Sequence, residues 1–225
     1  EVGRMSEVRL VPLKGHQLDV SQLFWENMLI GHPLPFELAC KVTYEKFCLD
    51  WYLNNPHHSV IAMHGNNVVG YALVCADQES YAKVERQNII RLILALIIAL
   101  VTFRINRLSL EFYIRRLRDS LTLLNSRHQI PDDVDIHAHV NIDHAHHNGT
   151  IARMLRDHVD ARCIELGRRG WFGEMNAVGG SRVVGLQRVV GTVVSVERNH
   201  TFTWLMGEPV SRLTTVRTPS IREAA

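Results

Sequence analysis

The sequence predicts a mixed α/β (α+β) protein in which helices flank a central sheet. Apolar runs of strand length alternate with helical patterns along the chain, and a strand–turn–strand signal surrounds HGNN at 64–67. The segment 78–128 contains neither Gly nor Pro and is helical in pattern. With 225 residues, 46% of them apolar, the chain is long enough for one substantial core. We therefore expect a single domain over 1–213, followed by a disordered tail over 214–225.

A strand and two helices open the predicted domain. The run VRLVPL at 8–13 has strand character, and Asp19 or Ser21 can cap the helix that follows. HPLPF interrupts that helix, and a second helix over 37–53 carries apolar residues at helical spacing. It ends before Asn-Asn-Pro, because Pro cannot continue a helix.

A hairpin and a helical insertion come next. Strands are predicted at 59–63 and 68–76, since the Gly and Asn residues of HGNN suit the positive dihedral angles of a tight turn. The helical pattern over 78–128 then separates this hairpin from the next strand signal. We interpret it as an insertion between the third and fourth strands.

The insertion contains the apolar run LILALIIALV at 92–101. A membrane-spanning helix needs about 20 apolar residues, roughly twice this length. The run therefore favours a helix that is buried or lies in a homodimer interface, and argues against stable membrane insertion. A peripheral membrane contact is the weaker alternative.

The second half alternates strands and helices. In DIHAHVNID at 135–143, apolar residues alternate with His137, His139 and Asn141, so one face is apolar and the other polar. The further predicted elements are a helix over 151–166, a strand from Trp171, a short helix over 181–190 and two final strands at 193–196 and 201–205.

Composition restricts the partners. The formal net charge is +2, and no segment concentrates Lys and Arg as a phosphate-tracking surface would, which argues against nucleic acid. The four cysteines form no CxxC pair, and the first residues lack the apolar core of a secretory signal, so we expect a cytoplasmic protein. The His-rich run at 137–147 has no second ligand cluster, and no metal is expected.

The segment VNIDHAHHNGTIARML at 140–155 narrows the choice of fold. It joins a strand through a Gly-containing loop to a helix, and it resembles the acetyl-CoA signature of the GCN5-related N-acetyltransferase (GNAT) superfamily. In this alignment His147 stands where that family has Arg or Gln, Thr150 where it has its first Gly, and Ala152 at the last position. The hairpin SVIAMHGNNVVGYALV and the stretch WFGEMNAVGG are similar to other strands of the family, with Asn176 at its usual Asn.

The resemblance implies a mostly antiparallel GNAT sheet and acetyl-CoA as acyl donor. The helix N-terminus would bind the pyrophosphate through its backbone N–H groups. The implied cofactor-binding residues are Val140, Asn141, Ile142, His147, Asn148, Gly149, Thr150, Ile151, Ala152 and Asn176.

Direct acetyl transfer in a ternary complex needs a base, because a primary amine is largely protonated at pH 7. His139 and His137 share one strand face beside the implied cofactor arm and titrate near neutrality, so they are the candidate bases, with Glu174 as the rival carboxylate. The alternative for His139 is a structural role, with a hydrogen bond within the sheet. Gln187 stands where the family often has a Tyr as general acid.

Two functions from different classes follow. The first is an N-acetyltransferase that acts on a primary amine of a small molecule or peptide. The second is a catalytically degenerate acyl-CoA-binding or regulatory module, suggested by His147, Thr150 and Gln187 at signature positions.

Overall fold

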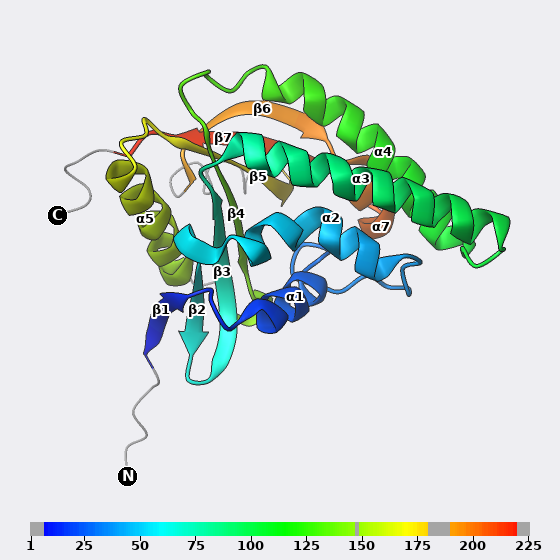
Figure 1. Cartoon of the computed structure of the whole chain (residues 1–225), viewed down its shortest axis with the longest axis horizontal. Coiled ribbons are helices and arrows are strands. Elements are labelled where there is room, and N and C mark those ends of the chain that lie inside the picture. Colours follow the sequence, from blue (N-terminus) through cyan, green and yellow to red (C-terminus); the bar gives the residue numbers. More distant parts are fainter. Residues whose placement is uncertain (1–6, 147–148, 180–189, 220–225) are drawn as a thin grey trace, which may run out of the picture.

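A computed structural model describes residues 7–146, 149–179 and 190–219 of the chain. Within them, one seven-stranded sheet has the order β1-β2-β3-β4-β5-β7-β6 (Figure 1). Its strands are β1 (Val8–Pro12), β2 (Val60–His64), β3 (Asn67–Cys75), β4 (Ile136–Ile142), β5 (Trp171–Val178), β6 (Thr192–Arg198) and β7 (Val210–Arg217). Every neighbouring pair is antiparallel except β4 and β5. The predicted mixed α/β class with a mostly antiparallel sheet is confirmed.

Helices cover both faces of this sheet (Figure 1). They are α1 (Gln17–Glu26), α2 (Lys41–Asn54), α3 (Gln78–Val101), α4 (Arg107–Arg127), α5 (Thr150–Glu165) and α7 (His200–Met206), with 3-10 turns at Pro56–His58 and His144–His146. The core on one face joins α5 to alternate residues of β2, β3 and β4, such as Ala72 and Ala138. The core on the other face joins α1, α2, α3 and α4 to the intervening residues, such as Tyr71 and Leu73. The strand alternation thus assigns each side chain to one of two layers.

The predicted hairpin and insertion are present. His64 pairs with Asn67 across the turn, where Gly65 has a φ of 62°. Two long helices, α3 and α4, lie between β3 and β4 in the chain; α3 packs on α2, whereas α4 packs on α7 and β6. No helix in the described part of the chain is long and apolar enough to cross a membrane.

Burial of the run at 92–101 is only partial, which corrects one of the two interpretations given for it. Leu92 and Ala99 are buried, but Leu94, Ile97 and Val101 are more than half exposed. The reason is that α3 contacts the body along one side only, although the run is apolar all round. Its outer side is therefore an apolar surface in contact with water.

The end of the chain differs from the prediction. The segment 201–205, predicted as a strand, lies in α7, and the last strand is β7. Capping side chains explain why this segment is a helix and not a strand. The side chain of Asn199 accepts from the Phe202 N–H at 2.9 Å, and the buried Asp119 of α4 accepts from the N–H groups of His200 and Thr201. Both side chains cap a helix start that the β-favouring residues of TFTWL do not indicate.

Part of the segment predicted as a tail is a strand. Residues 214–217 continue β7, where Arg217 pairs with Trp171, and the Arg217 guanidinium binds the buried carboxylate of Asp160 at 2.8 Å. The second helix begins at Lys41 instead of residue 37. The short helix predicted over 181–190 falls almost entirely outside the described residues, as does Gln187.

Candidate active site

The two central parallel strands separate soon after they meet. β4 and β5 pair only at Ile136–Trp171 and His137–Phe172, while β4 continues beside β3 to Ile142 and β5 continues beside β7 to Val178. Gly173 lies where they part, and a Cβ there would stand 3.0 Å from the Ala138 carbonyl oxygen. Beyond this point the facing edges of β4 and β5 have no strand partner in the described sheet. Strand edges that lie apart in this way present backbone N–H and C=O groups with which an extended ligand can pair.

The next α-helix after β4 is α5, which begins after the 3-10 turn His144–His146. Gly149 precedes α5 with a φ of 74°, a left-handed conformation that favours glycine. Thr150 is exposed at the first helical position, whereas Ile151 is buried against β3 beside Gly70. The first N–H groups of a helix lack intrahelical acceptors and carry partial positive charge, which suits an anion such as a pyrophosphate. His147 and Asn148, also assigned to this loop from the sequence, lie outside the described residues.

The polar face of β4 points to the layer that contains α1 and α2. Register with β3 sets Cys75 opposite His137, Leu73 opposite His139 and Tyr71 opposite Asn141. The two histidines therefore share one face, as the alternation predicted.

His137 is held by two neighbours. Its Nδ1 is 2.6 Å from the Tyr52 hydroxyl, and its ring stacks on Phe172 with centroids 4.8 Å apart and planes 24° apart. Burial raises the pKa of Tyr52 well above its ordinary value, so the phenol stays protonated. These contacts indicate a structural role for His137, which the sequence had offered as a candidate base.

His139 lies in an aromatic enclosure. The rings of Tyr71, Phe24 and Tyr52 surround it at centroid distances of 5.5, 6.3 and 6.5 Å. Burial, reinforced by the charge of His137 and opposed by that of Glu174, lowers the pKa of His139 to about 4. The imidazole is therefore neutral at pH 7 and keeps a lone pair that can accept a proton.

Glu174 belongs to the same arrangement. It follows Phe172 by two residues on β5, so both side chains lie on the sheet face that holds the histidines. Its carboxylate raises the pKa of His139, opposing the effect of burial. A negative charge here stabilises a protonated His139 ring, and that stabilisation is what proton uptake by a buried imidazole requires.

Three of the implied cofactor residues have partners within the chain. The Asn141 side chain donates to the Tyr71 hydroxyl at 3.3 Å and accepts the Ile142 N–H at 2.9 Å. A ligand that uses the Ile142 N–H must displace that contact. Asn176 accepts from the side chain of Asn199 at 2.7 Å, which links β5 to the cap of α7. Val140 is 37% exposed and accessible.

Tyr71 is the site residue that sequence reasoning missed. Its ring packs against His139, and its hydroxyl accepts a hydrogen bond from the Asn141 side chain. Burial raises the pKa of Tyr71, so the phenol stays protonated. The β-hairpin containing it was recognised, but only the pairing of β3 with β4 brings Tyr71 beside the histidines. No local sequence signal gives this register, because α3 and α4 separate β3 from β4 in the chain.

Other histidines cluster near the start of α5. His146 lies 3.0 Å from an Asp143 oxygen through Nδ1 and 3.3 Å from His64 through Nε2. Among the residues that the structure describes, no group of three or more His, Cys, Asp or Glu side chains is arranged to hold a metal ion. These contacts instead order the turn that precedes the helix.

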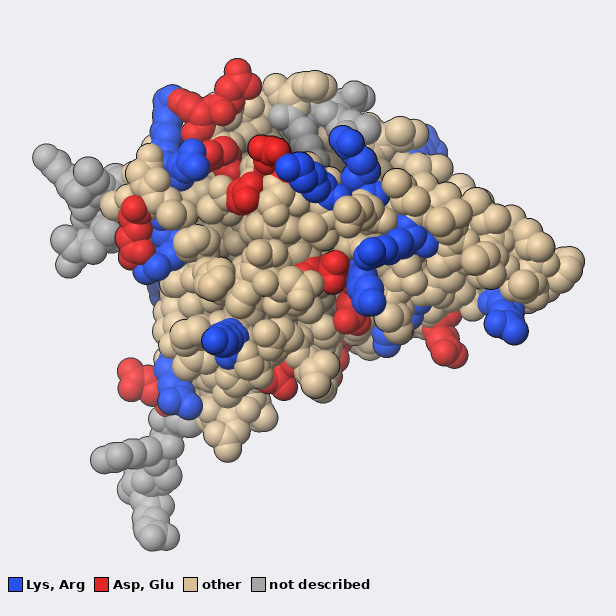
Figure 2. All heavy atoms as spheres, viewed as in Figure 1, with Lys and Arg blue, Asp and Glu red and all other residues tan. Residues whose placement is uncertain are grey.

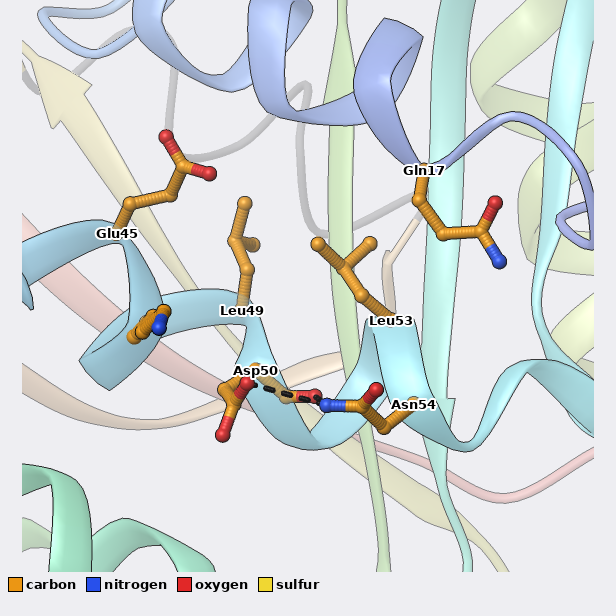
Figure 3. A pocket seen from close by; sticks show the side chains of 7 residues that line it. Gln17, Glu45, Leu49, Asp50, Leu53 and Asn54 are labelled. Atoms are coloured by element: carbon orange, nitrogen blue, oxygen red, sulfur yellow. Dashed lines mark hydrogen bonds between the residues drawn. The ribbon is translucent and has the colours of Figure 1, made fainter. Parts of the chain in front are cut away.

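A hollow of about 280 Å³ lies between α2 and the start of α1 (Figure 3). Its lining residues are Gln17, Glu45, Lys46, Leu49, Asp50, Leu53 and Asn54. The carboxylates are already engaged, since Glu45 accepts from the Trp25 indole at 2.6 Å and Asp50 accepts from Asn54 at 3.1 Å. None of the residues around His139 contributes to the hollow, so it is separate from the candidate site.

The separated parallel strands, followed by a helix N-terminus, define the fold of the GCN5-related N-acetyltransferases, and this chain has that fold. Solved structures similar to it over nearly the whole chain include SsHAT (TM-score 0.58, 12% identity, 95% of this chain and 99% of that one). An agmatine N-acetyltransferase variant in its apo form gives a TM-score of 0.54 at 12% identity (93% and 99%). The Salmonella typhimurium protein yncA, solved with its cofactor acetyl-CoA, gives 0.51 at 9% identity (97% and 96%). No family model matches the sequence, and no curated protein matches it significantly.

Proposed function

We propose that this protein is an acetyl-CoA-dependent N-acetyltransferase that acts on a primary amine of a small molecule or peptide. The observation that carries the proposal is the parting of β4 from β5 ahead of the N-terminus of α5, the next α-helix in the chain. An extended arm can lie along β4 at residues 140–142 while its pyrophosphate binds the N–H groups of Gly149, Thr150, Ile151 and Ala152. The fold shared with yncA, which was solved with acetyl-CoA, supports this choice of donor.

In the proposed reaction, the neutral amine attacks the thioester carbonyl carbon, the C–S bond breaks and CoA leaves as the thiolate. His139 takes the amine proton, because it is neutral at pH 7 and lies on the β4 face beside the proposed arm. Glu174 stabilises the imidazolium that forms. His137 serves as a positioning residue, since its Nδ1 is already bonded to Tyr52.

The alternative is a catalytically degenerate acyl-CoA-binding module. It is favoured by the low pKa of His139, which reduces the driving force for taking up a proton, and by Gln187 in place of the family's usual Tyr. A cytoplasmic location, where acetyl-CoA is available, is part of both proposals. The free state of all four cysteines supports that location.

Thiol release distinguishes the two functions. Purified protein is mixed with acetyl-CoA and, in turn, with agmatine, polyamines, amino-acid amides and short peptides, and free CoA is measured. An acetyltransferase releases CoA with some amine at a rate well above hydrolysis, and mass spectrometry finds the acetylated amine. Binding of acetyl-CoA without release on any amine of the panel would support the degenerate module instead.

A further inference from the structure

The insertion of α3 and α4, here called the arm (residues 78–127), carries an extensive exposed apolar surface. Fourteen large apolar side chains between 89 and 121 are exposed: Ile89, Ile90, Ile93, Leu94, Ile97, Ile98, Leu100, Val101, Phe103, Leu108, Leu110, Ile114, Leu117 and Leu121. Half-exposed side chains in this number leave an apolar area on the order of 1,000 Å², beyond the few hundred Å² usual on a monomer. Figure 2 shows the arm covered largely by uncharged residues on the visible face. Such a surface marks an interaction site.

The exposed residues follow helical periodicity on the sides that face away from the body. On α3, Ile90, Leu94, Ile97 and Val101 are spaced 4, 3 and 4 residues apart, opposite the buried Leu92 and Ala99. On α4, the exposed stripe is Leu110, Ile114, Leu117 and Leu121, opposite the buried Phe112 and Asp119. Each helix thus has two apolar sides: one packs on the body, and the other is exposed to water.

The tip of the arm presents an aromatic side chain. Phe103, just after α3, is 94% exposed and has a φ of 54°. The left-handed region is unfavourable for a bulky residue, and strain of this kind occurs mainly at functional sites. The Phe103 N–H donates to the Leu100 carbonyl, which fixes this conformation at the helix end.

The charges of residues 86–110 have one sign, and this segment is flanked by Glu85 and by Glu111, which pairs with Arg115. No acidic residue occurs from 86 to 110, whereas that segment contains Arg86, Arg91, Arg104 and Arg107. The same segment of a second copy would offer only arginines, and no acidic residue to pair with them. Anionic phospholipid headgroups complement them, and an amphipathic helix with basic flanks and Leu, Ile and Phe on its apolar side lies in the plane of a membrane surface.

From the apolar stripes, the exposed Phe103 and the four arginines, we propose that the arm is a peripheral docking surface for an anionic membrane. The arm is fixed to the body, because buried Asn88 donates to the Lys46 carbonyl at 3.2 Å and Tyr113 donates to the Ala39 carbonyl at 2.7 Å. Docking therefore brings the whole domain to the membrane with one orientation. The assignment is independent of the proposed acetyl transfer.

Flotation with vesicles tests the proposal. The full chain is mixed with vesicles of phosphatidylcholine alone or with 30% phosphatidylglycerol, at physiological ionic strength and without acetyl-CoA, and floated through a density gradient. We expect the protein to float with the anionic vesicles and to dissociate as salt is raised. Failure to float with either vesicle would overturn the proposal.

Variants on the arm test whether this surface is the part of the protein that binds the vesicles. Phe103→Ser should lower the partition coefficient at least tenfold, because an inserted aromatic side chain is lost. Arg104→Gln with Arg107→Gln should lower it roughly 25-fold, since each basic residue near an anionic surface contributes a factor of about 5. The matched controls are Leu18→Ser, at an 86% exposed apolar residue of α1, and Arg9→Gln on β1. Both controls should float like the unmodified chain.

Sedimentation velocity without vesicles distinguishes membrane docking from self-association of the chain. A monomer that floats, with flotation reduced by the arm variants, supports membrane docking. A dimer that Phe103→Ser dissociates, combined with no flotation of the unmodified chain, would assign the surface to self-association and contradict the proposal. Equal flotation of the arm variants and the controls would also contradict it.

Discussion

At the residue scale, the two histidines of β4 illustrate how environment divides chemically equivalent side chains. Both lie on the same strand face, two residues apart. His137 is fixed by Tyr52 and Phe172, whereas His139 is enclosed by aromatic rings and has a pKa lowered to about 4. The alternation of the sequence predicted that they share a face; it could not separate their roles, because their partners come from α2 and β5.

Replacing each histidine with glutamine should therefore have different effects. We expect His139→Gln to lower kcat by about 100-fold or more, the usual contribution of a general base, with folding intact. His137→Gln should instead lower the unfolding free energy by about 1–2 kcal/mol, through loss of the Tyr52 hydrogen bond and the stacking on Phe172. Thiol release and urea unfolding of both variants provide the check. Equal losses of activity with unchanged stability would mean that the roles are assigned wrongly.

At the element scale, the helices were predicted more successfully where local pattern determines them than where tertiary contacts do. The helices α3, α4 and α5 follow their apolar periodicity, and the hairpin follows its Gly-Asn turn. The helix α7 was predicted as a strand, because its caps come from Asn199 and from the distant Asp119. The last residues of β7 were assigned to a tail, because Asp160, their ion-pair partner, is far away in the chain.

The cap of α7 supplies an element-scale prediction. The buried carboxylate of Asp119 accepts from two backbone N–H groups and from the Thr201 hydroxyl at 2.6–3.0 Å. Asp119→Ala should lower the unfolding free energy by about 3 kcal/mol, because it leaves these buried donors unpaired. Asp132→Ala, at an exposed residue before β4, should change it by less than about 0.5 kcal/mol. Urea denaturation measures the change in unfolding free energy of both variants, and equal changes would contradict the capping role of Asp119.

A second prediction at this scale concerns the N-terminus of α5. Thr150→Asp adds a negative charge at the positive end of the helix dipole, which should raise the unfolding free energy by about 0.5 kcal/mol. The same charge competes with a pyrophosphate, so affinity for acetyl-CoA should fall at least tenfold. Ile164→Asp, at the other end of α5, should leave that affinity unchanged. Unaltered affinity in Thr150→Asp would place the phosphates elsewhere.

At the scale of the whole molecule, the fold class followed from the order of elements, and the GNAT architecture followed from one motif with two of its signature positions changed. The motif sufficed because a helix N-terminus binds an anion through backbone N–H groups, which do not depend on particular side chains. The sequence could not predict which apolar side chains are exposed to solvent. A run of Leu and Ile has the same pattern whether its outer side meets a core, a partner or water, so the apolar surface of the arm emerged only from the packing of α3 on α2.

Buried neutral histidines make the stability of the whole domain depend on pH. The folded-state pKa of His139, about 4, lies below its ordinary value of 6.5, so the unfolded chain binds more protons between these values. The unfolding free energy should therefore fall as the pH decreases from 6.5 toward 4, by about 3 kcal/mol from this group. Burial lowers the pKa of His58 and His158 as well, and these act in the same direction. Urea titrations at pH 7 and pH 4.5 test this, and His139→Gln should reduce the difference.

Calorimetric titration with acetyl-CoA tests the central claim most directly, because the separated strands and the start of α5 are proposed to form a cofactor site before any acceptor is known. We predict saturable binding of acetyl-CoA and CoA at one site per chain, weakened at least tenfold in Thr150→Asp and unchanged in Ile164→Asp. The absence of heat and of competition at millimolar acetyl-CoA would contradict the claim, and the fold would then serve a function other than acyl transfer.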